Sequence, residues 1–162
     1  MALTVFLSHS MQDQDVVSKV NDVIMAEGAV SRIAEFIVSP GTFVEEKLRE
    51  MISKSDIVVA VLTKGGLRSD WVNWELGVAA ALDKPIVPLL EEGADIPSYL
   101  EGREYIRFAR LTIEDAFESL AEFIRKLAIK KEQIELAILI IAIVAVVAII
   151  LLAIFAMASE VK

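Results

Sequence analysis

The chain has 162 residues, of which 56% are hydrophobic, and its mean hydropathy of +0.58 is higher than a soluble domain usually has. It contains no cysteine, which excludes a disulfide framework, thiol catalysis and cysteine metal sites. Its formal charge of −8 argues against nucleic acid as the main partner, because phosphate binding requires a concentrated basic surface.

Strand and helix patterns alternate along most of the chain. In chain order, the pattern predicts a strand at residues 3–8, a helix at 13–27, a strand at 29–33, a helix from 42 to about 54, a strand at 56–63, a helix at 71–82, strands at 85–90 and 105–108, and a helix from 112 onward. Thr42 and Glu45 form the pattern of a capping box, and Asp70 is expected to cap the third helix. This order predicts an α/β fold with a flavodoxin-like, doubly wound sheet of five parallel strands.

A long apolar run follows this domain. Residues 136–158 contain no charged, polar, glycine or proline residue. At about 1.5 Å per residue, a helix of this length spans roughly 34 Å, which is enough to cross a hydrocarbon core of about 30 Å. We therefore expect a single transmembrane α-helix after the sheet domain. Small residues gather on one face of this helix, so self-association through it is one hypothesis, and a simple tether is the other.

The charges beside the apolar run predict its orientation. Four basic residues precede the run, namely Arg125, Lys126, Lys130 and Lys131, and only residues 159–162 follow it. By the positive-inside rule, we expect the domain in the cytoplasm and the C-terminus across the membrane, as a single-pass tail anchor without a signal peptide. The expected boundaries are a domain at 1–127, a helical linker at 128–135, the transmembrane helix at 136–158 and a short tail at 159–162.

The common motifs for nucleotide and metal binding are missing from the sequence. No GxGxxG pattern follows the first strand and no GxxxxGK[ST] pattern occurs, so dinucleotide-fold and P-loop phosphate binding are unsupported. His9 is the only histidine, which leaves a zinc site unsupported. A Ser-His-Asp triad built on His9 is unfavourable, because neighbouring residues of a strand point to opposite faces. We expect His9 to shape the mouth of a pocket instead.

A tryptophan and a glutamate share one face of the predicted third helix. Trp71 and Glu75 are four residues apart, so their side chains lie one above the other. This pair suits a ribose with a cationic base, because the indole stacks on the base and the carboxylate stabilises the oxocarbenium charge that forms when the base leaves. The alternative is that Trp71 is a core anchor and Glu75 a solvated helix residue.

An ordered set of short segments resembles the Toll/interleukin-1 receptor (TIR) domain family in its prokaryotic form. The matching segments are residues 5–10 with Asp13 and Asp15, residues 39–41, residues 52–56, residues 62–63, Ser69, Trp71, residues 75–77 and residues 84–88. The resemblance extends from residue 3 to about residue 125. It implies a flavodoxin-like fold, and many members of the family hydrolyse NAD⁺ to nicotinamide and ADP-ribose or a cyclic form of it. Their active sites are commonly completed by a neighbouring TIR domain.

The resemblance also implies a set of site residues. Glu75 is the implied catalytic carboxylate, and Trp71 is implied to line the pocket for the nicotinamide ribose. The other implied substrate-binding residues are Phe6, Ser8, His9 and Ser10 at the end of the first strand, Phe36 and Gly41 in the loop before the second helix, and Thr63 and Ser69. No metal or cofactor is implied, because NAD⁺ is the substrate. Many relatives carry Arg, Tyr or Phe just after the first strand, where this chain has His9 and Ser10.

The expected function is a membrane-anchored TIR-domain NAD⁺ glycohydrolase that is activated by self-association and acts in cell defence. Its expected partners are NAD⁺, further copies of the chain through TIR contacts and the transmembrane helix, and the lipid bilayer, with no nucleic acid. The alternative is a non-catalytic TIR signalling scaffold that recruits other TIR proteins by homotypic assembly. A third interpretation is an enzyme like a nucleoside deoxyribosyltransferase, although a membrane anchor suits it less well.

Overall fold

The computed structural model describes residues 1–34 and 44–159. The chain divides into two compact units, and each is described by itself. One unit is the domain Ala2–Ala128, and the other contains Ile129 and the residues after it. Thr42, of the expected capping box, lies outside the described residues.

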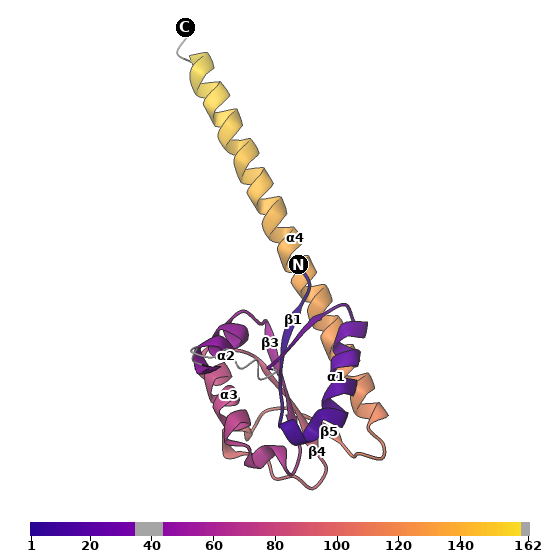
Figure 1. Ribbon diagram of the computed structural model, residues 1–162. Coiled ribbons are helices and arrows are strands. Elements are labelled where there is room, and N and C mark those ends of the chain that lie inside the picture. Colours follow the sequence, from indigo (N-terminus) through magenta and orange to yellow (C-terminus); the bar gives the residue numbers. More distant parts are fainter. Residues whose placement is uncertain (35–43, 160–162) are drawn as a thin grey trace. The chain divides into compact units, whose positions relative to one another are not determined.

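A sheet of five parallel strands forms the centre of the domain (Figure 1). The strands are β1 (Thr4–Ser8), β2 (Val30–Ile33), β3 (Ile57–Leu62), β4 (Ile86–Glu91) and β5 (Ile106–Phe108). Their spatial order is β2-β1-β3-β4-β5, and every pair of neighbours is parallel. This order confirms the predicted flavodoxin-like, doubly wound fold and puts its topological switch point between β1 and β3.

Helices cover both faces of this sheet. They are α1 (Gln14–Ala26), α2 (Val44–Ser53), α3 (Asp70–Ala81) and α4 (Glu114–Ser159), with short 3-10 turns at η1 (Met11–Asp13), η2 (Gly66–Arg68) and η3 (Ser98–Leu100). α1 and the first turns of α4 pack on one face, whereas α2 and α3 pack on the other (Figure 1). The expected cap of α3 is wrong by one residue. Ser69 has the extended backbone of a capping residue and its side chain accepts a hydrogen bond from Val72 N, whereas Asp70 is already helical.

The alternation of side chains along the strands divides the core in two. Val5 and Leu7 of β1 point toward α1 and α4, whereas Phe6 between them points toward α2 and α3. Every residue of β3 is buried, because helices cover both faces at the centre of the sheet. The same alternation directs Ser8, the last residue of β1, toward the face covered by α2 and α3.

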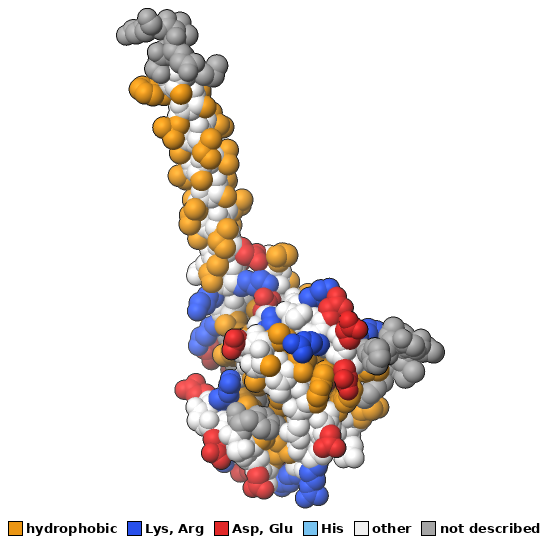
Figure 2. Space-filling model, turned by 90° about the vertical axis from the view of Figure 1, so that its left-hand side faces the viewer, with side chains coloured by type: hydrophobic (Ala, Val, Ile, Leu, Met, Phe, Trp, Pro, Cys, Tyr) orange, Lys and Arg blue, Asp and Glu red, His pale blue; other side chains and the backbone are white. Residues whose placement is uncertain are grey.

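The apolar run lies within α4. Among the described residues, α4 is the one helix that is long and apolar enough to cross a membrane. The described side chains of the run, at residues 136–156, are exposed, and Figure 2 shows hydrophobic side chains along this part of the helix with no charged side chain among them. By contrast, charged side chains of both signs are scattered over the visible face of the domain (Figure 2). An exposed surface of this kind is what a membrane-spanning helix presents to lipid.

Candidate active site

Glu75 lies on the buried side of α3. The helix packs on the sheet through Val72, Leu76 and Ala79, which all belong to the core. Glu75 precedes Leu76 on this side and is only 2% exposed. Its Oε2 accepts a hydrogen bond from Ser8 Oγ at 2.5 Å. The structure therefore contradicts the alternative in which Glu75 is a solvated helix residue.

The carboxyl group of Glu75 titrates near neutral pH. Burial raises its pKa from the ordinary value of 4.5 to about 7, and the hydrogen bond from Ser8 opposes this rise in part. A carboxyl group with such a pKa changes its charge within the physiological range. Perturbed groups of this kind cluster at functional sites.

A cavity of about 270 Å³ opens in front of Glu75. The residues that line it are His9, Ser10, Met11, Gln12, Ala34, Ser69, Trp71 and Glu75. The structure thus brings His9, Ser10, Ser69 and Trp71 together with Glu75, as the sequence predicts. The wall combines an indole, hydroxyl groups and a carboxyl group, a set that suits a sugar with an attached base.

Trp71 has an aromatic partner on its own helix. Its ring stacks on that of Trp74, with the ring centroids 5.6 Å apart and the ring planes inclined by 19°. Stacking of this kind is favourable and restricts the rotamers of both side chains. The indole that lines the cavity beside Glu75 is therefore held in place by its neighbour.

Two other predicted binding residues, Phe6 and Ser8, do not line the cavity. Phe6 is a residue of β1 whose side chain is fully buried against α2 and α3, so it belongs to the core beside the site. Ser8 is also buried and reaches the site through its hydrogen bond to Glu75. Phe36 and Gly41 lie outside the described residues.

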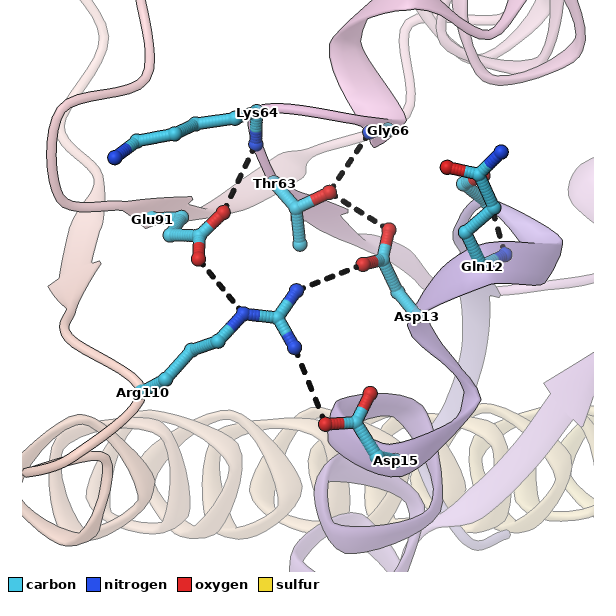
Figure 3. Close-up of polar contacts among 9 residues, drawn as sticks. Gln12, Asp13, Asp15, Thr63, Lys64, Gly66, Glu91 and Arg110 are labelled. Carbon is cyan, nitrogen blue, oxygen red and sulfur yellow. Dashed lines mark hydrogen bonds and ion pairs between the residues drawn. The ribbon is translucent and has the colours of Figure 1, made fainter.

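Thr63 belongs to a hydrogen-bonded network at the ends of the strands (Figure 3). Thr63 Oγ1 donates to Asp13 Oδ2 at 2.7 Å and accepts a hydrogen bond from Gly66 N at 2.7 Å. Arg110 donates from Nη2 to Asp13 Oδ1 at 3.1 Å and from Nε to Glu91 Oε1 at 2.8 Å. Asp13 is only 2% exposed, so these donors satisfy a buried carboxylate. Asp13, Thr63, Glu91 and Arg110 are called the strand-end network below, and none of them lines the cavity.

Met11 and Gln12 line the cavity although the sequence does not single them out, whereas Ala34 begins the segment 34–43 that the resemblance implies to line the pocket. Met11 and Gln12 directly follow the predicted residues after β1, and Ala34 directly follows β2. Met11 and Gln12 lie three and four residues beyond the end of β1, so extending the search by two residues past Ser10 finds both. The pairing of Asp13 with Arg110 is different, because these residues lie 97 positions apart and no local pattern connects them.

A second cavity, of about 440 Å³, adjoins the first. The residues that line it are His9, Met11, Gln14, Val17, Ser18, Asn21, Ile33 and Ala34. It shares His9, Met11 and Ala34 with the Glu75 cavity, so the two are neighbours. α1 contributes amide, hydroxyl and aliphatic side chains to its wall.

Several solved structures share the fold at low sequence identity. The TIR domain of the Toll-related receptor TRR-2 from Hydra magnipapillata is 19% identical, with a TM-score of 0.63 over 75% of this chain and 97% of that one. The CMP N-glycosidase BcmB from Clostridium botulinum is 20% identical, with a TM-score of 0.52 over 78% of this chain and 98% of that one. A TIR-STING receptor from C. gigas, in complex with 2′,3′-cGAMP, is 20% identical, with a TM-score of 0.58 over 72% of this chain but only 39% of that one.

The structural similarities show the fold, whereas the comparison with protein families identifies the family. No curated protein matches the chain. A family model described as the TIR domain matches residues 5–122, which include Trp71, Glu75 and almost the whole sheet. Because this match covers well over half of the sequence and agrees with the observed strand order, the chain belongs to the TIR domain family.

Proposed function

We propose that this chain is a membrane-anchored NAD⁺ glycohydrolase, which cleaves the bond between nicotinamide and ribose. One observation carries the proposal: the buried carboxyl group of Glu75, held by Ser8, faces a cavity that Trp71 also lines. The cavity lies where β1 ends, beside the switch point at which sheets of this class bind ligands. The Clostridium botulinum protein of the same fold is by name an N-glycosidase, which acts on a bond of the same kind.

The proposed reaction requires a carboxylate and a water molecule. The bond between C1′ of the ribose and the nicotinamide nitrogen breaks, and its electron pair passes to that nitrogen, so nicotinamide leaves as a neutral molecule. The ionised carboxylate of Glu75 stabilises the oxocarbenium charge that develops on the ribose. A water oxygen then bonds to C1′ and loses a proton to solvent, which gives ADP-ribose. Capture of C1′ by a group of the same substrate molecule gives a cyclic product instead.

Two features support a dinucleotide as the substrate. Trp71 presents an indole beside Glu75, and a cationic base is attracted to such a ring. The adjoining cavity of about 440 Å³ provides room for the part of a dinucleotide that a cavity of about 270 Å³ does not hold. Its amide and hydroxyl side chains suit uncharged sugar and base groups.

The test is the release of nicotinamide from NAD⁺ by the full chain in liposomes. Glu75→Gln keeps the size of the side chain and removes its charge. We expect the rate of nicotinamide release by this variant to fall by about 100-fold or more, because no carboxylate then stabilises the positive charge that develops on the ribose. Glu118→Gln is the matched control, since Glu118 is exposed on α4 and is expected to be dispensable.

The outcomes of this assay separate three functions. Full activity in Glu75→Gln would contradict the proposed role of that residue. Release of cytosine from CMP, without release of nicotinamide from NAD⁺, would favour a nucleotide N-glycosidase. Release of neither base by wild-type chains at high density would favour the alternative, a non-catalytic TIR scaffold that recruits other TIR proteins.

A further inference from the structure

Two walls of the Glu75 cavity belong to different loops, and His9 and Ala34 also line it. One wall comes from the turn after β1 and contains Ser10, Met11 and Gln12. The other comes from the loop after β3 and the start of α3, and it contains Ser69 and Trp71. The width of the cavity therefore depends on what holds these two loops together.

The strand-end network connects the two loops outside the cavity. Asp13 directly follows Gln12 and ends η1, and Thr63 directly follows the last residue of β3. The hydrogen bond from Thr63 Oγ1 to Asp13 Oδ2 therefore ties one loop to the other (Figure 3). Gly66 N donates to the same hydroxyl oxygen, so the start of η2 is bound at this point as well.

Two glycines allow the loops to approach closely. A Cβ atom added at Gly66 would lie 3.0 Å from Thr63 Oγ1 and 3.1 Å from Asp13 Oδ2. A Cβ atom added at Gly65 would lie 3.1 Å from Gln12 Oε1. These distances are shorter than ordinary van der Waals contacts, so the loops pack directly against each other.

Arg110 connects the two cavity loops to the end of β4. Its guanidinium group bridges Asp13 and Glu91, and its Nη1 also donates to Asp15 Oδ2 at 3.1 Å (Figure 3). Glu91 is the last residue of β4, and its Oε2 accepts a hydrogen bond from Lys64 N at 2.9 Å. Both loops are therefore held to the end of β4 through Arg110 and Glu91.

We infer that Asp13, Thr63 and Arg110 are positioning residues that set the width of the Glu75 cavity. The inference rests on the proposed function, because the width matters through the binding of NAD⁺. The three residues act through the loops and do not reach the substrate. Their loss is expected to raise the KM for NAD⁺ more than it lowers kcat, since Glu75 is held by α3 and by Ser8, which lie outside the network.

The experiment compares Arg110→Gln with Arg125→Gln in the full chain. Arg125 makes a bidentate pair with Glu27, at 2.7 and 2.8 Å, that involves neither cavity loop. The side chains of Arg110 and Arg125 are 44% and 58% exposed, so neither substitution removes a buried side chain. Thr63→Val removes the hydroxyl group at nearly constant shape, and Thr63→Ser restores it.

The expected result has two parts. Amide hydrogen exchange over residues 10–13 becomes about 10-fold faster or more in Arg110→Gln and Thr63→Val. The KM for NAD⁺ rises by about 10-fold in the same two variants, because the loop no longer meets the substrate in the right place. Arg125→Gln and Thr63→Ser match the wild type in both measurements. Unchanged exchange overturns the inference, and so does faster exchange with an unchanged KM.

A wild-type chain that releases no nicotinamide would end the proposed function without deciding this inference. In that case, acrylamide quenching of tryptophan fluorescence takes the place of KM. Trp71 lines the cavity and Trp74 does not, so every chain in this assay carries Trp74→Phe, which leaves Trp71 as its one tryptophan. Stronger quenching in Arg110→Gln than in Arg125→Gln supports the inference, and equal quenching overturns it.

Discussion

The burial of Glu75 determines which charge this side chain carries. A glutamate in water ionises around pH 4.5, whereas burial raises the pKa of Glu75 to about 7. The hydrogen bond that Ser8 donates favours the ionised form and limits the rise. At neutral pH the two forms are therefore close in free energy, and the charge that the proposed reaction requires is present on a substantial fraction of the molecules.

The rate of nicotinamide release is expected to rise with pH around a midpoint of about 7. Only the ionised form of Glu75 stabilises a positive charge on the ribose, and nicotinamide leaves as a neutral molecule that requires no acid. Below the midpoint the carboxyl group is protonated and the rate falls. The measurement is kcat/KM for NAD⁺ between about pH 5.5 and pH 8.5, because this ratio reports the pKa of groups in the free enzyme.

Ser8→Ala tests whether this midpoint belongs to Glu75. The hydroxyl group of Ser8 lowers the pKa of Glu75, so its removal is expected to move the midpoint to higher pH. A midpoint that does not move would assign the titration to another group. A rate that falls through this range as pH rises would mean that the protonated form is the active one, and would contradict the electrostatic role proposed for Glu75.

The sequence predicts the centre of the site better than its supports. Trp71 and Glu75 are separated by one helical turn, so a helix alone brings them together. The role of Thr63 could not be predicted from local sequence patterns. Its place after a strand predicts a side chain at the ligand-binding edge, yet its hydroxyl group is bonded to Asp13, 50 positions away. That pairing depends on how two loops pack, and neither loop encodes it alone.

The order of strands and helices is predictable from hydrophobic periodicity, but their ends depend on backbone detail. β3 is predictable because each of its residues is apolar, as a strand covered on both faces requires. The first residue of α3 is harder to predict, since Ser69 and Asp70 are both residue types that cap helices. The extended backbone of Ser69 decides between them, and a backbone angle cannot be inferred from residue type.

α1 is expected to distinguish a dinucleotide from a mononucleotide, because it supplies a wall of the second cavity. Ser18 lies on this wall and is exposed, so a larger side chain there fills space without disturbing the core. Ser18→Trp is expected to raise the KM for NAD⁺ by about 10-fold. The KM for nicotinamide mononucleotide, which lacks the adenosine part, is expected to stay unchanged. Steady-state kinetics on the two substrates is the measurement.

Lys19→Trp is the matched control for this prediction. Lys19 is the next residue of α1, about 100° further around the helix, and it is exposed. It is not among the residues that line the second cavity. An equal increase in KM for both substrates in Ser18→Trp would contradict a second subsite, and so would the same increase for NAD⁺ in Lys19→Trp.

The hydrophobic composition of the chain is divided between two unlike parts. In the domain Ala2–Ala128, the apolar side chains fill a core on both faces of the sheet. In α4, the described side chains of the apolar run are exposed and suited to lipid. The orientation of this candidate span, with the domain in the cytoplasm, stays a prediction from the basic residues before it.

Confinement of the chain to a membrane is expected to control the proposed activity through surface density. Anchored domains share a thin layer, so their effective concentration far exceeds that of the same number of free domains. A site that a neighbouring TIR domain completes therefore loses activity when the chains are spread apart, whereas a self-contained site does not. At constant protein and NAD⁺, a roughly 100-fold increase in the lipid-to-protein ratio of the liposomes is expected to lower nicotinamide release per chain by about 10-fold. A rate per chain that is independent of this ratio would mean that the monomer is competent, and the anchor would then determine only where NAD⁺ is consumed.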